Sequence, residues 1–492
     1  MSFARAAVRF ARSLWPRRSV RAYAGAATGR NTEGWRTPSS SADVELGLAG
    51  RRLRDRSRDL VRNNPHAAKA VSLLVSNIIG DGIMPRAVGP DESRNKKVME
   101  AFARWAGQCD ADGQLDFYGL QTLAVRGMVE GGEMLARRRW RGKSFGLTAP
   151  VQIQLLEADY LDDARDGLFS DGSSAVRGIE FDRIGRRAAY WMFRQHPGGA
   201  SAYNLASYRV PASEVAHLYE KQRQQSRGAP WSAPVIRRIR DVDDYDFAEG
   251  IRKKIEASTV AFVTAPDDSD YQVGADGKPV GMRCEDAHGN LVEKFAPGLI
   301  AYLRGGKDIR FNQPATVGGY EDYKRVTARE IASGFRVPYA LLTGDGSQEN
   351  FSAQRALLNQ FRRDCSIWQW QIVIPMLLEP WWEWFTEAAF LAGEIDDPDV
   401  PVEWSPPKWL PIEPYKDAMA ELITLRLGTR SYFDVCAERG RNPHDVLAEI
   451  AQFAEAVDKL GLILDCDPRK TTMAGVLQQL LEAPQDGPTA KN

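Results

Sequence analysis

The chain has 492 residues, more than one growing hydrophobic core accommodates, so two or more domains are expected. Hydrophobic residues make up 43% and charged residues 26%, which excludes a wholly disordered chain. Basic and acidic residues number 65 each, so overall electrostatic attraction to nucleic acid is excluded and any contact with DNA must be local.

The first 22 residues contain arginines but no acid, between apolar residues such as Phe3 and Trp15. This composition fits an organelle transit peptide, or a basic arm that continues through the Gly-, Thr- and Ser-rich stretch 24–41. We favour the arm. No membrane contact is expected, because the apolar runs 70–84 and 372–378 are shorter or more interrupted than the about 20 residues that span a bilayer.

The next 200 residues predict a mixture of helices and strands. Asn64 as N-cap, Pro65 at the first helical position and Gly80 after the end frame a helix over 65–79. Two further helices are expected at 92–106 and from 116 to the Gly131-Gly132 pair. Short apolar runs between Gly, Asp and Pro clusters predict strands over 151–219.

A long helix is expected over 233–262, where one apolar stripe runs between many charged residues. About 30 helical residues would reach roughly 45 Å. Residues 265–318 are rich in Gly, Asp and Pro and contain strand-like pieces, which indicates a small β insertion. A returning helix over 319–333 should be stopped by Gly334 and Pro338.

The stretch 344–351 follows, and after it a helix over 352–373 that Pro375 and Pro380 should kink or end. Five tryptophans at helix-face spacing indicate core or subunit-interface packing rather than base stacking: Trp368, Trp370, Trp381, Trp382 and Trp384. Helices are expected again over 415–461, and residues 466–492 should form a frayed tail.

Motifs for catalysis and metal binding fail on spacing. Gly142-Lys143 and Gly306-Lys307 lack the earlier glycine of a phosphate-binding loop, and 110–116 lacks the glycine of a calcium loop and predicts a solvated turn. Neither HExxH nor GxSxG occurs, and the five histidines are scattered. The five cysteines form no CxxC pair, which indicates a reducing compartment and small buried side chains: Cys109, Cys284, Cys365, Cys436 and Cys466. No catalytic residue, cofactor or metal site is therefore predicted.

The sequence of 344–350 leaves three interpretations open: a metal site, a plain turn between helices, or a mobile polar loop in a channel. Its residues are Gly344, Asp345, Gly346, Ser347, Gln348, Glu349 and Asn350. Asp345 and Glu349 lack a third ligand at suitable spacing, while two glycines and the absence of Lys and Arg suit either a turn or a channel loop.

A resemblance decides among them. Stretches that carry it are "RDLVRNNPHAAKAVSLLVSNIIGDGI", "FARWAGQCDADGQLDFYGLQTLAVRGMVEGGEML", "GIEFDRIGRRAAYWMFRQHP", "FAPGLIAYLRGGKDIRF" and "REIASGFRVPYALLTGD". In this order, over roughly residues 45–460, the chain resembles the lambda-type portal proteins of tailed bacteriophages.

This resemblance implies an α+β portal fold, with a mixed α/β wing, a long helical stem, a small β clip and a helical crown. The implied parts are a basic arm 1–45, wing 46–228, stem helix 229–264, clip 265–318, returning stem helix 319–343, tunnel loop 344–351, long kinked helix 352–392, wing and crown helices 393–465, and tail 466–492.

The function that the resemblance implies is a ring of about twelve subunits at one capsid vertex, through which double-stranded DNA is packaged and ejected without sequence specificity. Implied partners are the terminase packaging motor, the major capsid and scaffold proteins, and the head–tail adaptor. The implied location is the virion, after assembly in the host bacterial cytoplasm.

Three groups of residues carry roles in this interpretation. Asp345 and Glu349 would form a negative collar that keeps the duplex unbound, because each neutralised phosphate would add a barrier to sliding. We hypothesise that neighbouring stems pair through Arg237, Arg238, Arg240, Asp241, Asp243 and Asp244. The clip would meet the motor and the adaptor through residues that include Glu285, Asp286, Glu293 and Lys294.

Two other classes of function remain as alternatives. One is a nucleic-acid-processing enzyme, a nuclease or an NTPase, that uses the scattered carboxylates. The failed phosphate-loop and metal spacings argue against it. The other is an organellar protein, which rests on residues 1–22 alone.

Overall fold

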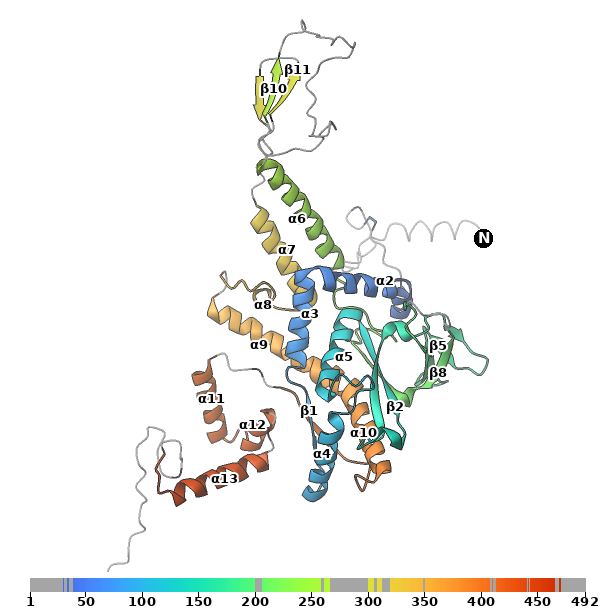
Figure 1. The fold of residues 1–492 in the computed structure, drawn as a ribbon, viewed down its shortest axis with the longest axis vertical. Coiled ribbons are helices and arrows are strands. Elements are labelled where there is room, and N and C mark those ends of the chain that lie inside the picture. The colour runs from blue at the N-terminus through green and yellow to red at the C-terminus, as the bar shows by residue number, and fades with distance from the viewer. Residues whose placement is uncertain are drawn as a thin grey trace, which may run out of the picture.

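The computed structural model describes residues 39–199, 206–257, 319–347, 350–407, 413–439 and 443–464, with the short pieces 30, 33–34, 261–265, 300–304, 308–311, 409, 441 and 469. Figure 1 shows a broad body from which two helices project, with strands beyond them. The predicted mixture of helices and sheets is confirmed. No helix within the described ranges is both long enough and apolar enough to cross a membrane.

The body begins with two helices that meet at Asn64. Helix α2 (Ala42–Asn63) starts where the Ser41 side chain accepts the N–H of Val44, and the sequence analysis did not anticipate this helix. Asn64 ends α2 and caps α3 (Pro65–Ile78), accepting the N–H groups of His66 and Ala67. The N-cap and proline signals at the start of the second helix are therefore confirmed.

Helices α4 (Glu92–Ala106) and α5 (Phe117–Gly131) occupy the predicted positions. Most of the turn between them is exposed, as expected, because residues 112–116 all face solvent, but its first residue does not. Asp110 is buried, and its carboxylate accepts the backbone N–H groups of Asp112, Gln114 and Leu115 at 2.9–3.0 Å. This acid shapes the turn instead of facing water.

Two antiparallel sheets lie side by side in the body. One has the order β3-β2-β9 and the other β4-β5-β6-β7-β8. Their bounds are β2 (Glu133–Trp140), β3 (Val151–Glu157), β4 (Gly167–Leu168), β5 (Ser174–Val176), β6 (Ile179–Phe181), β7 (Arg187–Phe193), β8 (Ser207–Pro211) and β9 (Val215–Tyr219).

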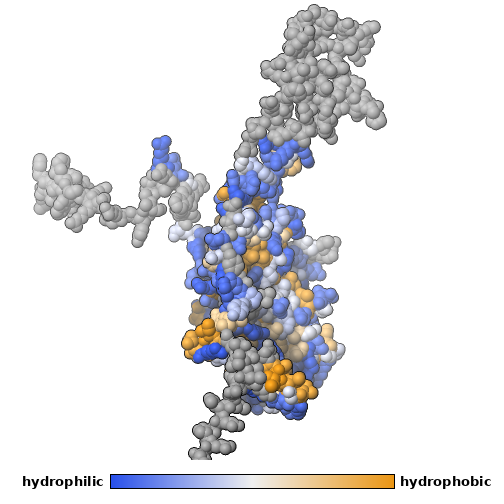
Figure 2. Space-filling model, turned by 90° about the vertical axis from the view of Figure 1, so that its left-hand side faces the viewer, coloured by the Kyte–Doolittle hydropathy of each residue, from blue (hydrophilic) through white to orange (hydrophobic). Residues whose placement is uncertain are grey.

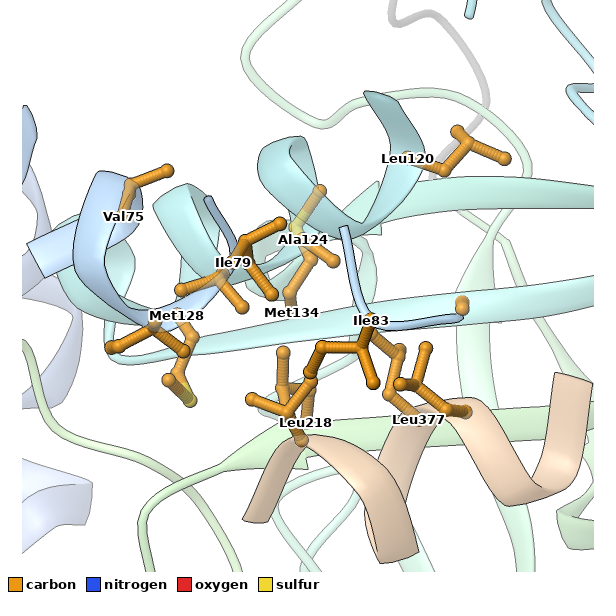
Figure 3. Packing of buried hydrophobic residues seen from close by; sticks show 14 of the residues in the cluster. Val75, Ile79, Ile83, Leu120, Ala124, Met128, Met134, Leu218 and Leu377 are labelled. Atoms are coloured by element: carbon orange, nitrogen blue, oxygen red, sulfur yellow. The ribbon is translucent and has the colours of Figure 1, made fainter. Parts of the chain in front are cut away.

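Strand β2 separates two apolar cores because alternate side chains point to opposite faces. Met134 and Ala136 join the larger core under α5, whereas Leu135 joins a smaller core with residues of β7 such as Tyr190 and Met192. Figure 3 shows part of the larger core, where side chains from α3, α5, β2 and β9 converge.

The long helix expected after residue 351 continues through both prolines. It comprises α9 (Phe351–Trp368), a π-helical segment (Gln369–Leu378) and α10 (Glu379–Ala392). Pro375 lies inside the π-helical segment, where the local change of hydrogen bonding lets the helix continue. Four of the five clustered tryptophans are buried as predicted, while Trp370 is exposed.

The projection consists of α6 (Ile236–Ala257), α7 (Tyr320–Phe335) and three strands, β10 (Ala261–Ala265), β11 (Ile300–Arg304) and β12 (Asp308–Phe311). Strand β10 pairs in parallel with β11 and antiparallel with β12. Helix α6 has 22 residues, so the expected helix over 233–262 was too long at both ends. The end of the expected helix overlaps the first two residues of β10, a strand whose β-branched and aromatic residues favour extended structure.

Gly334 does not stop the returning helix, which ends at Phe335 before Arg336 in a left-handed conformation with φ +61°. A Cβ added to Gly334 would lie 2.0 Å from Cγ1 of Val235. The glycine therefore does not stop the helix. It allows the end of α7 to approach the chain before α6 closely at the base of the projection.

Within the body, β1 (Met84–Ala87) pairs with β13 (Val402–Ser405), and Ala87 and Trp404 of this pair join the larger core. Three helices follow β13 in the chain. These C-terminal helices are α11 (Pro414–Arg426), α12 (Tyr432–Glu438) and α13 (Pro443–Lys459), which agrees with the helical prediction for 415–461. Among the described cysteines, Cys109, Cys365 and Cys436 are buried, as predicted.

Candidate functional site: the projection, its base and the loop before α9

A cluster of polar aromatic contacts joins helices α6 and α7. The Tyr245 ring lies 4.6 Å from that of Tyr323, centroid to centroid, and 6.0 Å from that of Tyr320. Tyr320 donates its hydroxyl to Asp246 at 3.0 Å, and Lys324 Nζ lies 2.9 Å from the same carboxylate. The hydrogen bond to Asp246 raises the pKa of Lys324, so this amine stays charged at neutral pH.

The apolar stripe of α6 divides into two parts. Val235, before the helix, is buried, as are Ile239 and Val242 in its first half. In the second half, Phe247 is 73% exposed and Ile251 is 42% exposed. The first half of the stripe, near the body, therefore packs within the chain. The second half, toward the strands, leaves apolar surface in contact with water.

The six charges expected to join neighbouring stems fall into two groups. Four of them are engaged within the chain: Arg238 pairs with Glu330 of α7, Arg240 pairs with Asp244, and Asp243 accepts a hydrogen bond from Asn64. Arg237 and Asp241 are exposed, and no ion pair to either occurs within the described residues.

The base of the projection is fixed by Arg336, whose role the sequence analysis missed. Its guanidinium donates to both carboxylate oxygens of Glu220, at 2.7 and 2.8 Å. It also lies 4.1 Å from the ring centroid of Trp231 and 5.1 Å from that of Trp368. A planar, bidentate and stacked arginine fixes the direction in which α7 meets the body.

On the other side of the base, a buried ion network joins the chain before α6 to the sheet. Arg227 Nε donates to both oxygens of Glu133 at 2.8 and 3.0 Å, and the Gly228 N–H donates to Oε2 at 3.0 Å. Both side chains are 1% exposed. Burial opposes ionisation, but Arg227 and then His217 hold the pKa of Glu133 well below its usual range.

His217 completes this network as a neutral side chain. Burial lowers its pKa to about 4 despite the hydrogen bond to Glu133. Its Nε2 lies 2.9 Å from Glu133, and its Nδ1 lies 2.7 Å from Nη1 of Arg187. Because arginine can only donate, Nδ1 must accept, and the proton resides on Nε2 and points to Glu133.

The loop before α9 has internal hydrogen bonds in its described part. Gly344, with φ +77°, ends the short helix α8 (Tyr339–Thr343). The Asp345 carboxylate accepts the N–H of Ser347 at 3.0 Å and its hydroxyl at 2.6 Å, and Tyr339 donates to it at 3.2 Å. These bonds, the Ser347 hydroxyl first, lower the pKa of Asp345, so it carries a negative charge at neutral pH.

The far end of the loop is capped and braced. Asn350 accepts the N–H of Ala353 at 2.8 Å and begins α9, and Gln354 donates to the Gly346 carbonyl at 3.2 Å. Gln348 and Glu349 lie outside the described residues, as do the expected clip residues Glu285, Asp286, Glu293 and Lys294. In Figure 1 this loop lies on the side of the body away from the sheets.

The C-terminal helices also leave apolar side chains exposed. Those at least 40% exposed on α11 and α13 are Tyr415, Ile423, Leu447, Ile450 and Phe453. The link to the body includes Arg355 of α9, which contacts Glu413 and Asp417 at 3.4 and 2.9 Å. On the face shown in Figure 2, the described surface is mostly hydrophilic, with separate hydrophobic patches.

One group of side chains has ligand atoms close enough for a metal ion: Glu157, Asp159 and His196. Both carboxylates are already paired, however. Arg58 lies 3.0 Å from Glu157 and 2.7 Å from Asp159, and Arg54 lies 3.3 Å from Asp159. The group is explained as an ion-pair network of the body.

Comparison with known proteins identifies the family. Residues 28–369, more than half of the chain, match the family described as "Phage portal protein, lambda family". The chain belongs to this family. It is accordingly a portal protein, a structural protein and not an enzyme.

Two phage proteins that are similar in sequence are also named portal proteins. The chain is 27% identical over 454 residues to the "Probable portal protein" of Halomonas phage phiHAP-1, covering 87% of this chain and 84% of the relative. It is 22% identical to the "Portal protein" of Escherichia phage N15, covering 90% and 91%. A chain from the neck of an empty GTA particle matches with a TM-score of 0.42 and 16% identity, covering 82% of this chain and 95% of the other.

Proposed function

We propose that this chain forms a closed ring of about twelve copies around a channel for double-stranded DNA, at one vertex of a phage capsid. The exposed surface of the projection is the observation that supports this proposal most directly. Its upper half exposes Phe247 and Ile251, and it presents Arg237 and Asp241 without ion partners among the described residues. A neighbouring copy of the same helix pair would cover the apolar side chains and supply opposite charges.

The parts of the chain receive roles in this ring. We assign the body to the wing, α6 and α7 to the stem, β10 to β12 with residues 265–318 to the clip, and the C-terminal helices to the crown. The clip would serve as the docking platform for the terminase packaging motor and then for the head–tail adaptor. The wing would contact the major capsid and scaffold proteins, after assembly in the host bacterial cytoplasm.

The loop 344–351 would face the channel. DNA must slide past it, and each phosphate that a cation neutralised would add affinity and a matching barrier to movement. The loop offers Asp345 as a negative charge and contains no lysine or arginine. Repeated around a ring, this charge would keep the duplex centred and unbound.

The first prediction tests the ring through its apolar contact. In the double variant F247S/I251S we expect at least about tenfold fewer rings at equal protein concentration. Each buried apolar side chain contributes about 1.5–3 kcal/mol per contact, and 1.4 kcal/mol corresponds to a factor of ten. Negative-stain electron microscopy would count annular particles, and size-exclusion chromatography with light scattering would measure their mass.

The matched control is L168S, which removes an 86% exposed apolar side chain from strand β4 of the body. We expect normal rings from it. All three proteins should unfold at the same urea concentration as monomers, because the replaced side chains are exposed there. Normal rings from F247S/I251S, or equal loss in L168S, would contradict this placement of the subunit contact.

The second prediction concerns the loop. Deleting residues 344–351 should leave rings that assemble but particles that retain packaged genome poorly, because the channel would lose its narrowest collar. Quantitative PCR of nuclease-protected DNA in purified particles would measure retention. Packaging and retention equal to those of the unaltered protein would exclude a gating role for this loop.

A further inference from the structure

A pocket of about 350 Å³ opens between the two sheets of the body, away from the projection and the loop. It is lined by Arg137, Arg139, Gln154, Leu156, Tyr160, Phe193, Arg194 and Tyr208. Three of these residues are arginines and none is an acid. A concave site of this size with three positive charges and no acid differs from the small apolar core beside it, to which Leu135, Tyr190 and Met192 belong.

The position of the arginines on β2 makes the pocket unusual. Side chains at 135, 137 and 139 share one face of this strand. Leu135 is fully buried in the small core between the sheets, so the next positions on that face would ordinarily continue the apolar packing. Arg137 stands there instead, with its side chain only 15% exposed.

Arg137 is not fully satisfied by the chain. It donates to the Tyr208 hydroxyl and lies 4.0 Å from Glu214, but its Nε is buried without a hydrogen-bond acceptor within the described residues. A buried guanidinium N–H that lacks an acceptor costs free energy, which an oxyanion in the pocket would recover.

The other two arginines are also available to a ligand. Arg194 lies over the Tyr208 ring at 5.5 Å and Arg137 at 5.1 Å, so one tyrosine orients two guanidinium groups. Neither Arg139 nor Arg194 has an ion pair within the described part of the chain. Guanidinium groups held in this way are suited to bidentate recognition of oxyanions.

We propose that this pocket binds an acidic peptide segment of a partner protein, with carboxylates on the arginines and an apolar side chain against the partly exposed Phe193. The volume admits one or two side chains but not a DNA duplex. A free phosphate ion would satisfy the arginines and make no use of Phe193. The proposal does not depend on the ring or on the channel.

The test measures binding by fluorescence anisotropy. The probe is a fluorescein-labelled peptide of alternating glutamate and phenylalanine, and the comparison peptide replaces each glutamate by glutamine. We expect the full-length protein to bind the acidic peptide, and R139Q/R194Q to bind it at least about tenfold more weakly. The control R186Q changes an exposed arginine on the turn between β6 and β7 that does not line the pocket, and should bind like the unaltered protein.

Circular dichroism would verify that all variants fold, and negative stain would score ring formation separately, so that failure of the pocket and failure of the ring are distinguishable. Equal affinities in R139Q/R194Q and R186Q would overturn the proposal. It would also be overturned if the glutamine peptide bound as tightly as the acidic peptide, or if inorganic phosphate or a short DNA duplex bound with the same arginine dependence while the acidic peptide did not.

Discussion

The body and the projection differ in how they place the side chains discussed above: the body buries and pairs them, and the projection leaves them exposed. In the body, Glu133 and Arg227 are almost fully buried and each has several hydrogen-bond partners. In the projection, Phe247 and Asp241 face solvent. These buried charges of the body find their partners within the same chain, whereas Phe247 and Asp241 find none within the described residues. Mutations should therefore affect folding in the body and assembly in the projection.

The largest effect is expected where the body is most self-contained. Replacing Glu133 by alanine leaves Nε of Arg227 and the Gly228 N–H buried without their acceptor, while Nη1 of Arg227 keeps its contact with Asp163. We expect the free energy of unfolding to fall by about 3–5 kcal/mol, the usual cost of removing one partner of a buried ion pair. Urea unfolding followed by tryptophan fluorescence would measure it.

Its control is D396A, which breaks the exposed pair between Asp396 and Lys97. This pair should contribute less than about 1 kcal/mol, because exposed ion pairs are screened by water. If E133A were no more destabilising than D396A, the network at Glu133 would not be what fixes the junction between sheet and projection.

The same network predicts that acid weakens the body. His217 titrates at about 4 when folded and at the usual 6.5 when unfolded, so the unfolded chain binds more protons between these values. Stability is therefore lost as the pH falls through this window, by roughly 2 kcal/mol near pH 5. The lowered pKa of Glu133 acts in the same direction at more acidic pH.

Urea unfolding at about pH 7 and about pH 5 would test this effect in the unaltered protein and in two variants. H217Q should lose less stability on acidification, whereas H196Q, which alters a partly exposed histidine of the same body, should follow the unaltered protein. An unchanged pH dependence in H217Q would show that another group is responsible.

The comparison also shows where sequence reasoning succeeds. Helices α3 and α5 were predicted to within one or two residues. Their ends are set by residues that affect only the adjacent backbone, namely Asn64, Pro65 and the Gly131-Gly132 pair. The family resemblance was likewise readable from local stretches in a fixed order. Helix α2 was missed although Ser41 offers a cap, because its many charges continue the basic character of the arm before it.

What could not be predicted depends on contacts distant in sequence. Glu133 and Arg227 are 94 residues apart, and neither the pairing nor the neutral state of His217 is visible in the pattern of the chain. The engagement of Arg238 by Glu330 similarly removes a charge that the sequence analysis had reserved for a neighbouring subunit. Gly334 is a third example, since its role depends on the side chain of Val235.

The smallest effect is expected at this glycine, where the projection meets the body. The variant G334A places a methyl group 2.0 Å from Cγ1 of Val235, so one of the two helices must shift. Overpacking of this kind costs about 1–3 kcal/mol, and the better helix propensity of alanine offsets up to about 1 kcal/mol of it. We expect a net loss of about 1–2 kcal/mol in the urea unfolding of the monomer.

Gly250, in the middle of α6, is the matched control, because nothing lies within 4 Å of the position its Cβ would take. G250A should stabilise the monomer by up to about 1 kcal/mol, so the same substitution in the two helices has opposite signs. The double variant V235A/G334A sharpens the comparison. Shortening Val235 removes the methyl group that blocks the alanine, so the two changes should together cost less than the sum of the single losses. Strict additivity would mean that Gly334 and Val235 do not meet at the base of the projection.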